Sequence, residues 1–150
     1  MRRKLFETMV GQSTPQQSFT VRTRPRTFED ITAQVQSIVQ SSNVRTGLCH
    51  VFLRHTSASI LICENADPSV QRDLERFMQR VAPDGAPQYE HDAEGPDDMP
   101  SHIRSTLAGV SLTIPVQDGR LMLGTWQGVY VWEHRADAHD RQVVVSIASL

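Results

Sequence analysis

Long apolar runs and cysteines are scarce in this 150-residue sequence, which has only 2 Cys. A membrane-spanning helix needs about 18 or more consecutive apolar residues, and no stretch approaches that length. The basic start, residues 1–4, is followed by no apolar run of the kind that marks a signal peptide. Cys49 and Cys63 lie in apolar, strand-like segments, where buried, reduced thiols are the simplest interpretation. We therefore expect a cytoplasmic protein with no membrane partner.

An excess of charge of either sign is lacking as well. The chain has 15 Lys and Arg against 17 Asp and Glu, a net charge of -2 at pH 7. Binding to a phosphate backbone normally requires a concentrated basic surface, so no nucleic-acid partner is expected. The one short basic cluster, Arg22, Arg24 and Arg26, is explained by a solvated strand end, with anion binding as the alternative. The length suits a single domain over residues 1–150.

The first half of the chain predicts strands around one helix. Strands are expected at 6–10 and 18–24, joined as a hairpin by the turn-prone residues between them. Thr27 is a candidate N-cap for a helix that continues to about Gln40, because apolar residues follow it at helical spacing. The nearly continuous apolar runs 48–53 and 58–63 predict two buried strands.

The second half predicts two helices, a long loop and a strand meander. Asp67 and Pro68 predict an N-cap and first helical position for a helix that reaches about Val81. Residues 83–100 are rich in Pro and acids and predict a loop, and a short helix from Pro100 should end at Gly109. Asp118-Gly119 predicts a hairpin turn among strands expected at 110–116, 121–123, 128–133 and 142–148. The fold class that follows is α+β, with a mixed, mainly antiparallel sheet and helices packed on one face.

Three of the 6 His residues stand in chemically suggestive surroundings. His55 follows a buried strand beside two hydroxyls, His91 lies in the acidic loop, and His102 lies in the first turn of the short helix. Converging imidazoles of this kind form divalent metal sites with an open coordination position. The alternative for each is a hydrogen-bonded structural histidine. Carboxylates of the loop are candidates to orient the imidazoles by accepting a hydrogen bond from the ring nitrogen that does not bind the metal. These carboxylates are Asp92, Asp97 or Asp98.

Two further segments combine polar and aromatic residues at strand ends. Glu64 and Asn65 directly follow an apolar strand, where side chains reach the mouth of a sheet and ligands often bind. Trp126 and Gln127 stand between two glycines, which predicts either a turn carrying a packed Trp or a platform for a planar ring. The acidic residues of the loop have two interpretations. They are either a Mg²⁺ site beside a phosphate, as an alternative to the histidine site, or solvated side chains with no ligand.

These segments together, in their order and spacing, resemble the YjbQ family over roughly three fifths of the chain. The motifs that carry the resemblance are His55-Thr56-Ser57-Ala58-Ser59, Glu64-Asn65-Ala66-Asp67-Pro68, His91-Asp92, Glu94-Gly95-Pro96-Asp97-Asp98-Met99-Pro100-Ser101-His102-Ile103, Gly119-Arg120, Gly124-Thr125-Trp126-Gln127-Gly128 and Glu133-His134-Arg135. The resemblance implies a compact α+β fold, a homotrimer and a weak secondary thiamine-phosphate synthase activity. That reaction joins a hydroxymethylpyrimidine diphosphate to a thiazole phosphate and releases pyrophosphate.

The resemblance also implies roles for individual residues. A divalent ion, Zn or Mg, would be bound by His55, His91 and His102 and would stabilise the departing pyrophosphate. The catalytic residues would be His55, Glu64, Asp92 and His102, and the substrate would contact Thr56, Ser57, Asn65, Trp126, Gln127 and Arg135. Two alternatives remain at this point. One is an enzyme that acts on another phosphorylated small molecule, and the other is a non-catalytic trimeric module that binds a metal or an anion.

Overall fold

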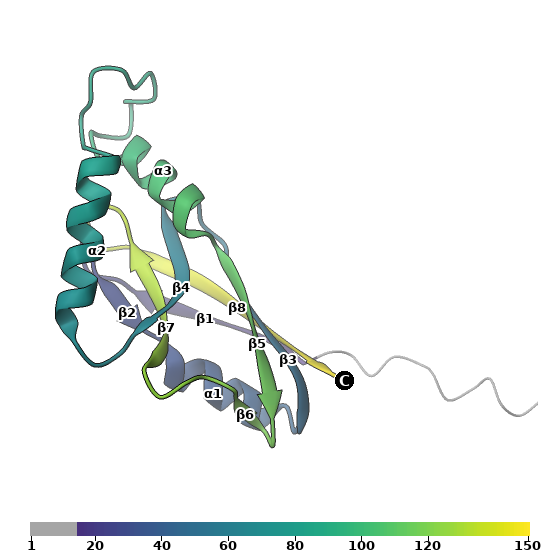
Figure 1. Ribbon diagram of the computed structural model, residues 1–150. Coiled ribbons are helices and arrows are strands. Elements are labelled where there is room, and N and C mark those ends of the chain that lie inside the picture. The colour runs from purple at the N-terminus through teal and green to yellow at the C-terminus, as the bar shows by residue number, and fades with distance from the viewer. Residues whose placement is uncertain (1–14) are drawn as a thin grey trace, which may run out of the picture.

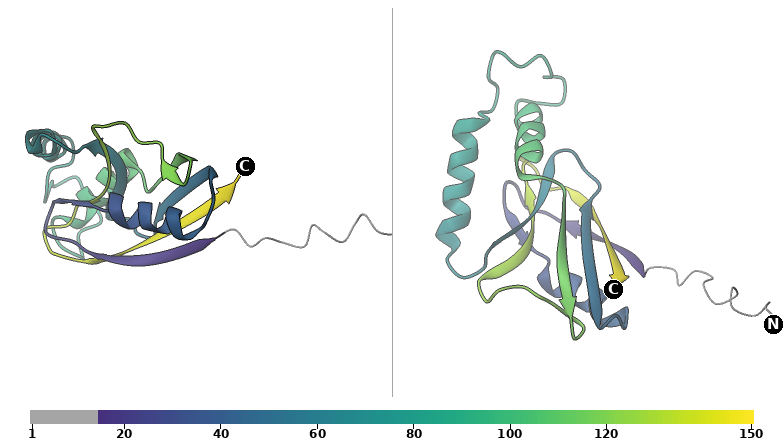
Figure 2. Two further views of the ribbon diagram at one scale, coloured as in Figure 1. Left: turned by 90° about the horizontal axis from the view of Figure 1, so that it is seen from below. Right: turned by 45° about the vertical axis from the view of Figure 1, so that its right-hand side comes forward.

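A computed structural model describes residues 15–150 and contains two antiparallel sheets with three helices (Figures 1 and 2). The five-stranded sheet has the order β1-β8-β3-β5-β6, and the three-stranded sheet has the order β2-β7-β4. The strands are β1 (Gln16–Arg22), β2 (Phe28–Asp30), β3 (Thr46–Leu53), β4 (Ala58–Glu64), β5 (Ser111–Gln117), β6 (Arg120–Leu121), β7 (Gln127–Glu133) and β8 (Asp140–Ser149). The helices are α1 (Thr32–Ser41), α2 (Pro68–Val81) and α3 (Asp98–Ala108). The predicted α+β class is confirmed, with its strands divided between two sheets.

The main core lies between the two sheets. Val51, Val145 and Ile147 of the large sheet are fully buried against Val129 and Val131 of the small sheet. The inward side of α1 closes this core at one end, where Val35 and Val39 are also fully buried. Burial of these branched apolar side chains is the main favourable contribution to folding.

Helix α2 covers the other face of the small sheet. Phe28, Cys63, Tyr130 and Trp132 form a second buried cluster, to which α2 contributes Met78. The helix begins as predicted, because Asp67 accepts a hydrogen bond from Ser69 N and Pro68 occupies the first helical position. Cys49 and Cys63 are free and buried, which confirms the interpretation of reduced thiols.

The predicted helix start at Thr27 is wrong. Phe28 belongs to β2, where it pairs in register with Trp132, and the two rings stack with centroids 4.4 Å apart. Burying Phe28 in an extended strand therefore prevails over the local helical pattern. The helix begins only at Thr32, whose backbone N–H and hydroxyl both donate to Asp30 Oδ1. The predicted strand at 6–10 and its hairpin lie outside the described residues.

Two other expectations about the strands are corrected. Strand β3 is buried on one face only, since Leu48 and Phe52 are 37% and 41% exposed on the outer face of the large sheet. The final strands do not form a meander, because β7 belongs to the small sheet and β8 lies between β1 and β3. The turn at Asp118-Gly119 is confirmed, and both residues have the positive φ that a tight hairpin requires.

The predicted long loop is confirmed as residues 82–97, which lie beyond the ends of α2 and α3 (Figures 1 and 2). The loop returns the chain to α3, which packs on β4 and ends at Gly109 with φ 90°. Within residues 15–150 no helix is long and apolar enough to cross a membrane.

Candidate metal centre and the adjoining hollow

Three side chains gather where the long loop enters α3. Asp98 is the first residue of the helix and His102 lies one turn further along, so both are on one helix face, and His91 approaches from the loop. Asp98 Oδ2 lies 2.7 Å from His91 Nε2 and 3.2 Å from His102 Nε2. In the described part of the chain this is the one group of three metal-ligating residue types whose ligand atoms all lie within 4.8 Å of one another.

Arg135 fixes the carboxylates of this group. Its Nη1 donates to Asp98 Oδ1 and its Nε donates to Asp97 Oδ2, each over 2.8 Å, while Nη2 donates to the Glu94 carbonyl over 2.9 Å. Burial raises the pKa of Asp98, but the hydrogen bond from His91 and the charges of His102 and Arg135 reverse this and lower the pKa overall. Asp98 is therefore an ionised carboxylate that is only 2% exposed.

The hydrogen bonds of His102 determine where its ring carries a proton. Its Nδ1 lies 3.0 Å from the Thr56 carbonyl, which can only accept, so Nδ1 carries hydrogen. In the neutral ring Nε2 then has a lone pair facing the Asp98 carboxylate, so two acceptors meet at 3.2 Å. Such a pair needs a cation or a second proton between its members. An imidazole whose far nitrogen donates to a carbonyl is also the usual arrangement of a metal-binding histidine.

His55 lies outside this group and has a different role in the fold. Its Nε2 accepts a hydrogen bond from Gln142 N over 2.8 Å, so its ring proton is on Nδ1. Burial, followed by the charge of Arg141, lowers the pKa of His55. The neighbouring segment is tied down as well, since Arg141 Nη2 donates to both the carbonyl and the hydroxyl of Ser57.

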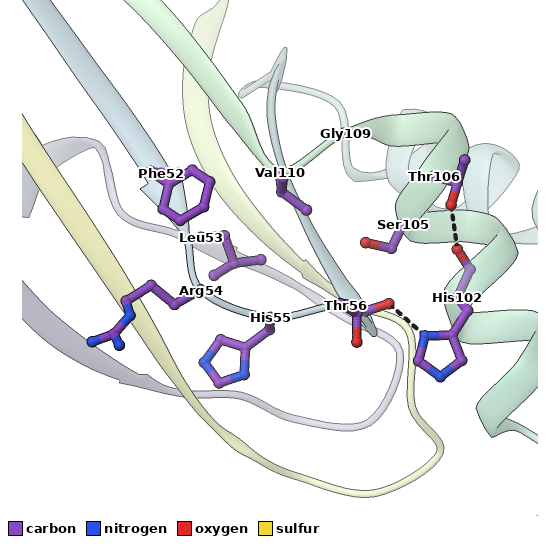
Figure 3. A pocket seen from close by; sticks show the side chains of 10 residues that line it. All are labelled: Phe52, Leu53, Arg54, His55, Thr56, His102, Ser105, Thr106, Gly109 and Val110. Atoms are coloured by element: carbon purple, nitrogen blue, oxygen red, sulfur yellow. Dashed lines mark hydrogen bonds between the residues drawn. The ribbon is translucent and has the colours of Figure 1, made fainter.

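An open hollow of about 610 Å³ adjoins the group on the side of His102 (Figure 3). It lies between the end of β3 and helix α3, and it is lined by Phe52, Leu53, Arg54, His55, Thr56, His102, Ser105, Thr106, Gly109 and Val110. A second hollow of about 350 Å³ lies within the loop and contains His91 and Asp92 in its lining. Two members of the three-residue group therefore each line a hollow, His102 the first and His91 the second.

Four of the expected site residues lie at the C-terminal end of β4, away from the histidines: Glu64, Asn65, Trp126 and Gln127. Asn65 N donates to the Trp126 carbonyl, Gln127 Oε1 accepts from Gly124 N, and Glu64 accepts from Asp67 N. Strand β4 has 7 residues and spans about 20 Å at the usual rise per residue, and His102 contacts Thr56 beyond its opposite end. Trp126 is 64% exposed. Within one chain these residues do not meet the histidines.

Beneath the site is a buried ionic network whose importance sequence reasoning missed. Arg141 Nε donates to Glu133 Oε2 over 2.7 Å, and Thr23 donates to the same oxygen over 2.7 Å. Burial raises the pKa of Glu133, but its hydrogen bonds from Arg141 and Thr23 lower the pKa overall. The only sequence signal is the position of Glu133 in a polar triplet that ends an apolar strand. This network supports the segment that holds His55 and Thr56.

Comparison with known proteins places nearly all of the described residues in one family. The family model described as "UPF0047 protein YjbQ-like" matches residues 17–149. The chain belongs to the YjbQ-like UPF0047 family. UPF0047 protein sll1880 of Synechocystis is 48% identical over 133 residues, which cover 89% of this chain and 90% of that protein. UPF0047 protein YjbQ of Salmonella typhimurium is 47% identical over 133 residues, covering 88% and 96% respectively.

Solved structures of YjbQ-like proteins share the fold. An uncharacterised YjbQ/UPF0047 protein of Clostridium acetobutylicum matches with a TM-score of 0.81 and 39% identity, covering 87% of this chain and 98% of that one. A YjbQ-like protein of unknown function from Sulfolobus solfataricus matches with a TM-score of 0.83, covering 92% and 99%, and at 24% identity it supports the fold alone. The match to YjbQ-like structures confirms the resemblance read from the ordered motifs.

Proposed function

We propose that the protein is a metal-dependent transferase that acts on phosphorylated small molecules, with a secondary thiamine-phosphate synthase-like reaction. The reaction would join a hydroxymethylpyrimidine diphosphate to a thiazole phosphate and release pyrophosphate. The observation that carries the proposal is the meeting of His102 Nε2 with Asp98 Oδ2, two acceptors 3.2 Å apart in the neutral, Nδ1-protonated form of the ring. A divalent cation bound by both atoms would remove this conflict.

The donor set favours zinc or a similar ion over magnesium. Two imidazoles and one carboxylate, from His91, His102 and Asp98, match the ligands that zinc and related transition metals take with an open position. Magnesium prefers oxygen ligands and retains its waters. Arg135 supports the same interpretation, because it occupies Asp98 Oδ1 and leaves Oδ2 directed at the two rings.

The charges of the residues around the site support the proposed role of a metal. Asp92, Asp97 and Asp98 lie in or beside it, and the single positive charge of Arg135, which pairs with Asp97 and Asp98, offsets only part of their charge, so without a bound cation they would repel a diphosphate. A bound divalent ion would neutralise the pyrophosphate as it departs. The chain's own contribution is to hold Asp98 through Arg135, orient His102 through the Thr56 carbonyl, and offer the Nδ1–H of His55 as a neutral donor.

The proposal is tested by measuring formation of thiamine phosphate from the two phosphorylated rings. We expect His102→Ala to lower the rate about 10²-fold or more, the scale of one well-placed electrostatic contributor. Protein from which a chelator has removed the metal should be inactive. Glu90 is an exposed loop residue outside the three-residue group, so Glu90→Gln should keep the wild-type rate. Full activity in verified metal-free protein would reject the metal mechanism. Inactivity of metal-loaded wild type would redirect attention to another phosphorylated substrate or to a non-catalytic binding module.

We also propose that the protein forms a homotrimer. Leu48 is 37% exposed and pairs in register with exposed Pro115, whose carbonyl accepts a hydrogen bond from Met122, itself 53% exposed. This apolar patch at one end of the large sheet suits a contact between copies of the chain. Light scattering at micromolar concentration is expected to give three times the monomer mass. A monomer mass would overturn the proposed homotrimer.

A further inference from the structure

The hollow beside His102 has the size and lining of a small-molecule site. Its volume of about 610 Å³ falls in the range of about 300–1,000 Å³ that is usual for ligand pockets. Its lining comes from the end of β3, from residues 54–56 of the connection between β3 and β4, from helix α3, and from the short connection to β5. The hydroxyls of Ser105 and Thr106 are occupied by the backbone carbonyls of Ala58 and His102. The remaining groups that can contact a ligand are an apolar side, a basic end and the exposed side chain of Thr56 beside His102.

Phe52 and Val110 form the apolar side (Figure 3). Phe52 is 41% exposed, although it belongs to a strand in which alternate residues are fully buried. An aromatic ring held by a rigid strand offers a flat surface for stacking at little cost in conformational entropy. This side of the hollow suits a planar, mostly apolar ring.

Arg54 and His55 form the basic end, away from His102 (Figure 3). Arg54 uses Nη1 to donate to Gln142 Oε1 over 3.2 Å, which positions the guanidinium. The same residue, Gln142, donates its backbone N–H to His55 Nε2 and so leaves the ring proton of His55 on Nδ1. One residue thus orients a permanent cation and a neutral N–H donor that are neighbours in the chain, and this pair suits a phosphate or carboxylate.

We propose that the hollow binds a planar ring carrying one anionic group, with the ring against Phe52 and Val110 and the anion beside Arg54 and His55. The inference rests on the proposed function, because it assigns this hollow to the singly phosphorylated acceptor. The diphosphate belongs beside His91, Asp98 and His102, where a metal would neutralise it. Arg54 and His102 lie at opposite ends of the hollow, so a ring held between them would lie between the anion site and the proposed metal.

The test uses three simple probes and isothermal titration of metal-free protein. Phenyl phosphate has a ring and an anion, inorganic phosphate has the anion alone, and benzyl alcohol has the ring alone. We expect phenyl phosphate to bind about tenfold or more tightly than either of the others, since only it uses both ends. Phe52→Ala should remove the advantage of phenyl phosphate over inorganic phosphate. Arg54→Gln should weaken both phosphates about tenfold.

Two changes on α2 are matched controls. Phe77 is 51% exposed, and Arg76 pairs with Asp73 at the surface, so Phe77→Ala and Arg76→Gln remove similar groups away from the hollow. Equal effects of Phe52→Ala and Phe77→Ala would overturn the inference. So would a change of molecular mass in Phe52→Ala with unchanged probe affinity, since the hollow would then be a contact between copies.

A parallel zinc titration separates this inference from the proposed function. Phe52 and Arg54 are not among the three grouped residues, so their variants should bind zinc as wild type does. Intact zinc binding without selective binding of phenyl phosphate would overturn the inference alone. Selective binding of phenyl phosphate in a protein that binds no zinc would overturn the proposed metal mechanism and leave the ring site standing.

Discussion

His134 Nε2 lies 2.7 Å from the hydroxyl oxygen of Ser59, and both residues are completely buried. The ring of His134 also contacts Trp132, with centroids 4.8 Å apart. Burial, followed by the charges of Arg104 and Arg141, lowers the pKa of His134 to about 3. A histidine that is neutral and fully enclosed cannot exchange protons with a substrate, so this Ser-His pair stabilises the fold and is no catalytic dyad.

The first prediction concerns pH and stability. In the unfolded chain His134 takes a proton below its ordinary pKa of 6.5, whereas in the folded chain it stays neutral down to about 3. Its contribution to stability is therefore fully present above pH 6.5 and is lost as pH falls from 6.5 towards 3, by up to about 1.4 kcal/mol per pH unit. Urea unfolding at pH 7, 6 and 5 measures this slope.

Variants of the histidines identify the source of the slope. His134→Gln should flatten the slope between pH 6.5 and 5, because the amide does not titrate there. His55 also has a lowered pKa and acts in the same direction, so His55→Gln should remove a smaller part. Glu133 has a lowered pKa as well, but its effect begins only below its ordinary value of 4.5. A wild-type free energy of unfolding that is constant from pH 7 to 5 would contradict the prediction.

The second prediction concerns the buried pair of Arg141 and Glu133. Arg141→Met removes the main partner of a carboxylate that is 0% exposed, and we expect a loss of about 3–5 kcal/mol in the free energy of unfolding. Arg22→Met breaks an ion pair with Asp140 in which both side chains are 65% exposed, and it should cost less than about 1 kcal/mol. Denaturant unfolding compares the two, and similar losses would show that burial does not decide the effect.

The third prediction concerns Arg135 as the residue that positions Asp98. Arg135→Lys keeps the charge but cannot donate to Asp97, Asp98 and the Glu94 carbonyl at once. We expect zinc affinity to fall about 10–100-fold, the range for partners of metal ligands. Zinc titration measures the affinity, and circular dichroism verifies that the variant is folded. Unchanged affinity in a folded Arg135→Lys protein would separate Arg135 from the metal site.

Sequence patterns predicted the elements whose signals are local. Asp67 and Pro68 begin α2 as expected, and Asp118-Gly119 forms the turn between β5 and β6, because a cap and a tight turn depend on a few adjacent residues. The pattern failed at Phe28, where pairing with the distant β7 decides the conformation. The division into two sheets was likewise beyond reach, since strand partners are set by long-range packing.

The candidate site was predictable in part for the same reason. Asp98 and His102 have the four-residue spacing that places side chains on one helix face, and this is a readable signal. His91 joins them through the path of the loop, which no local rule gives. Glu64 directly follows the predicted strand at 58–63, so the sequence already places it at the end of β4 opposite Thr56. The position of Trp126 beside that end depends on the pairing of β4 with β7, which no local rule gives.

The last prediction decides between two ligand sets for the proposed metal. The sequence predicted His55, His91 and His102, whereas the structure groups Asp98 with His91 and His102 and commits His55 Nε2 to Gln142 N. Asp98→Asn removes the shared carboxylate and should lower zinc affinity about 10²-fold or more. Loss of a residue that only hydrogen-bonds to a ligand typically lowers metal affinity about 10–100-fold, and loss of the ligand itself should lower it at least as much. His55→Ala should change it less than about threefold, since His55 is outside the group. His50→Ala, on the exposed face of β3, is the control for loss of an unrelated imidazole. Titration of each purified variant with zinc gives the affinities, and a large loss in His55→Ala with wild-type affinity in Asp98→Asn would restore the three-histidine site.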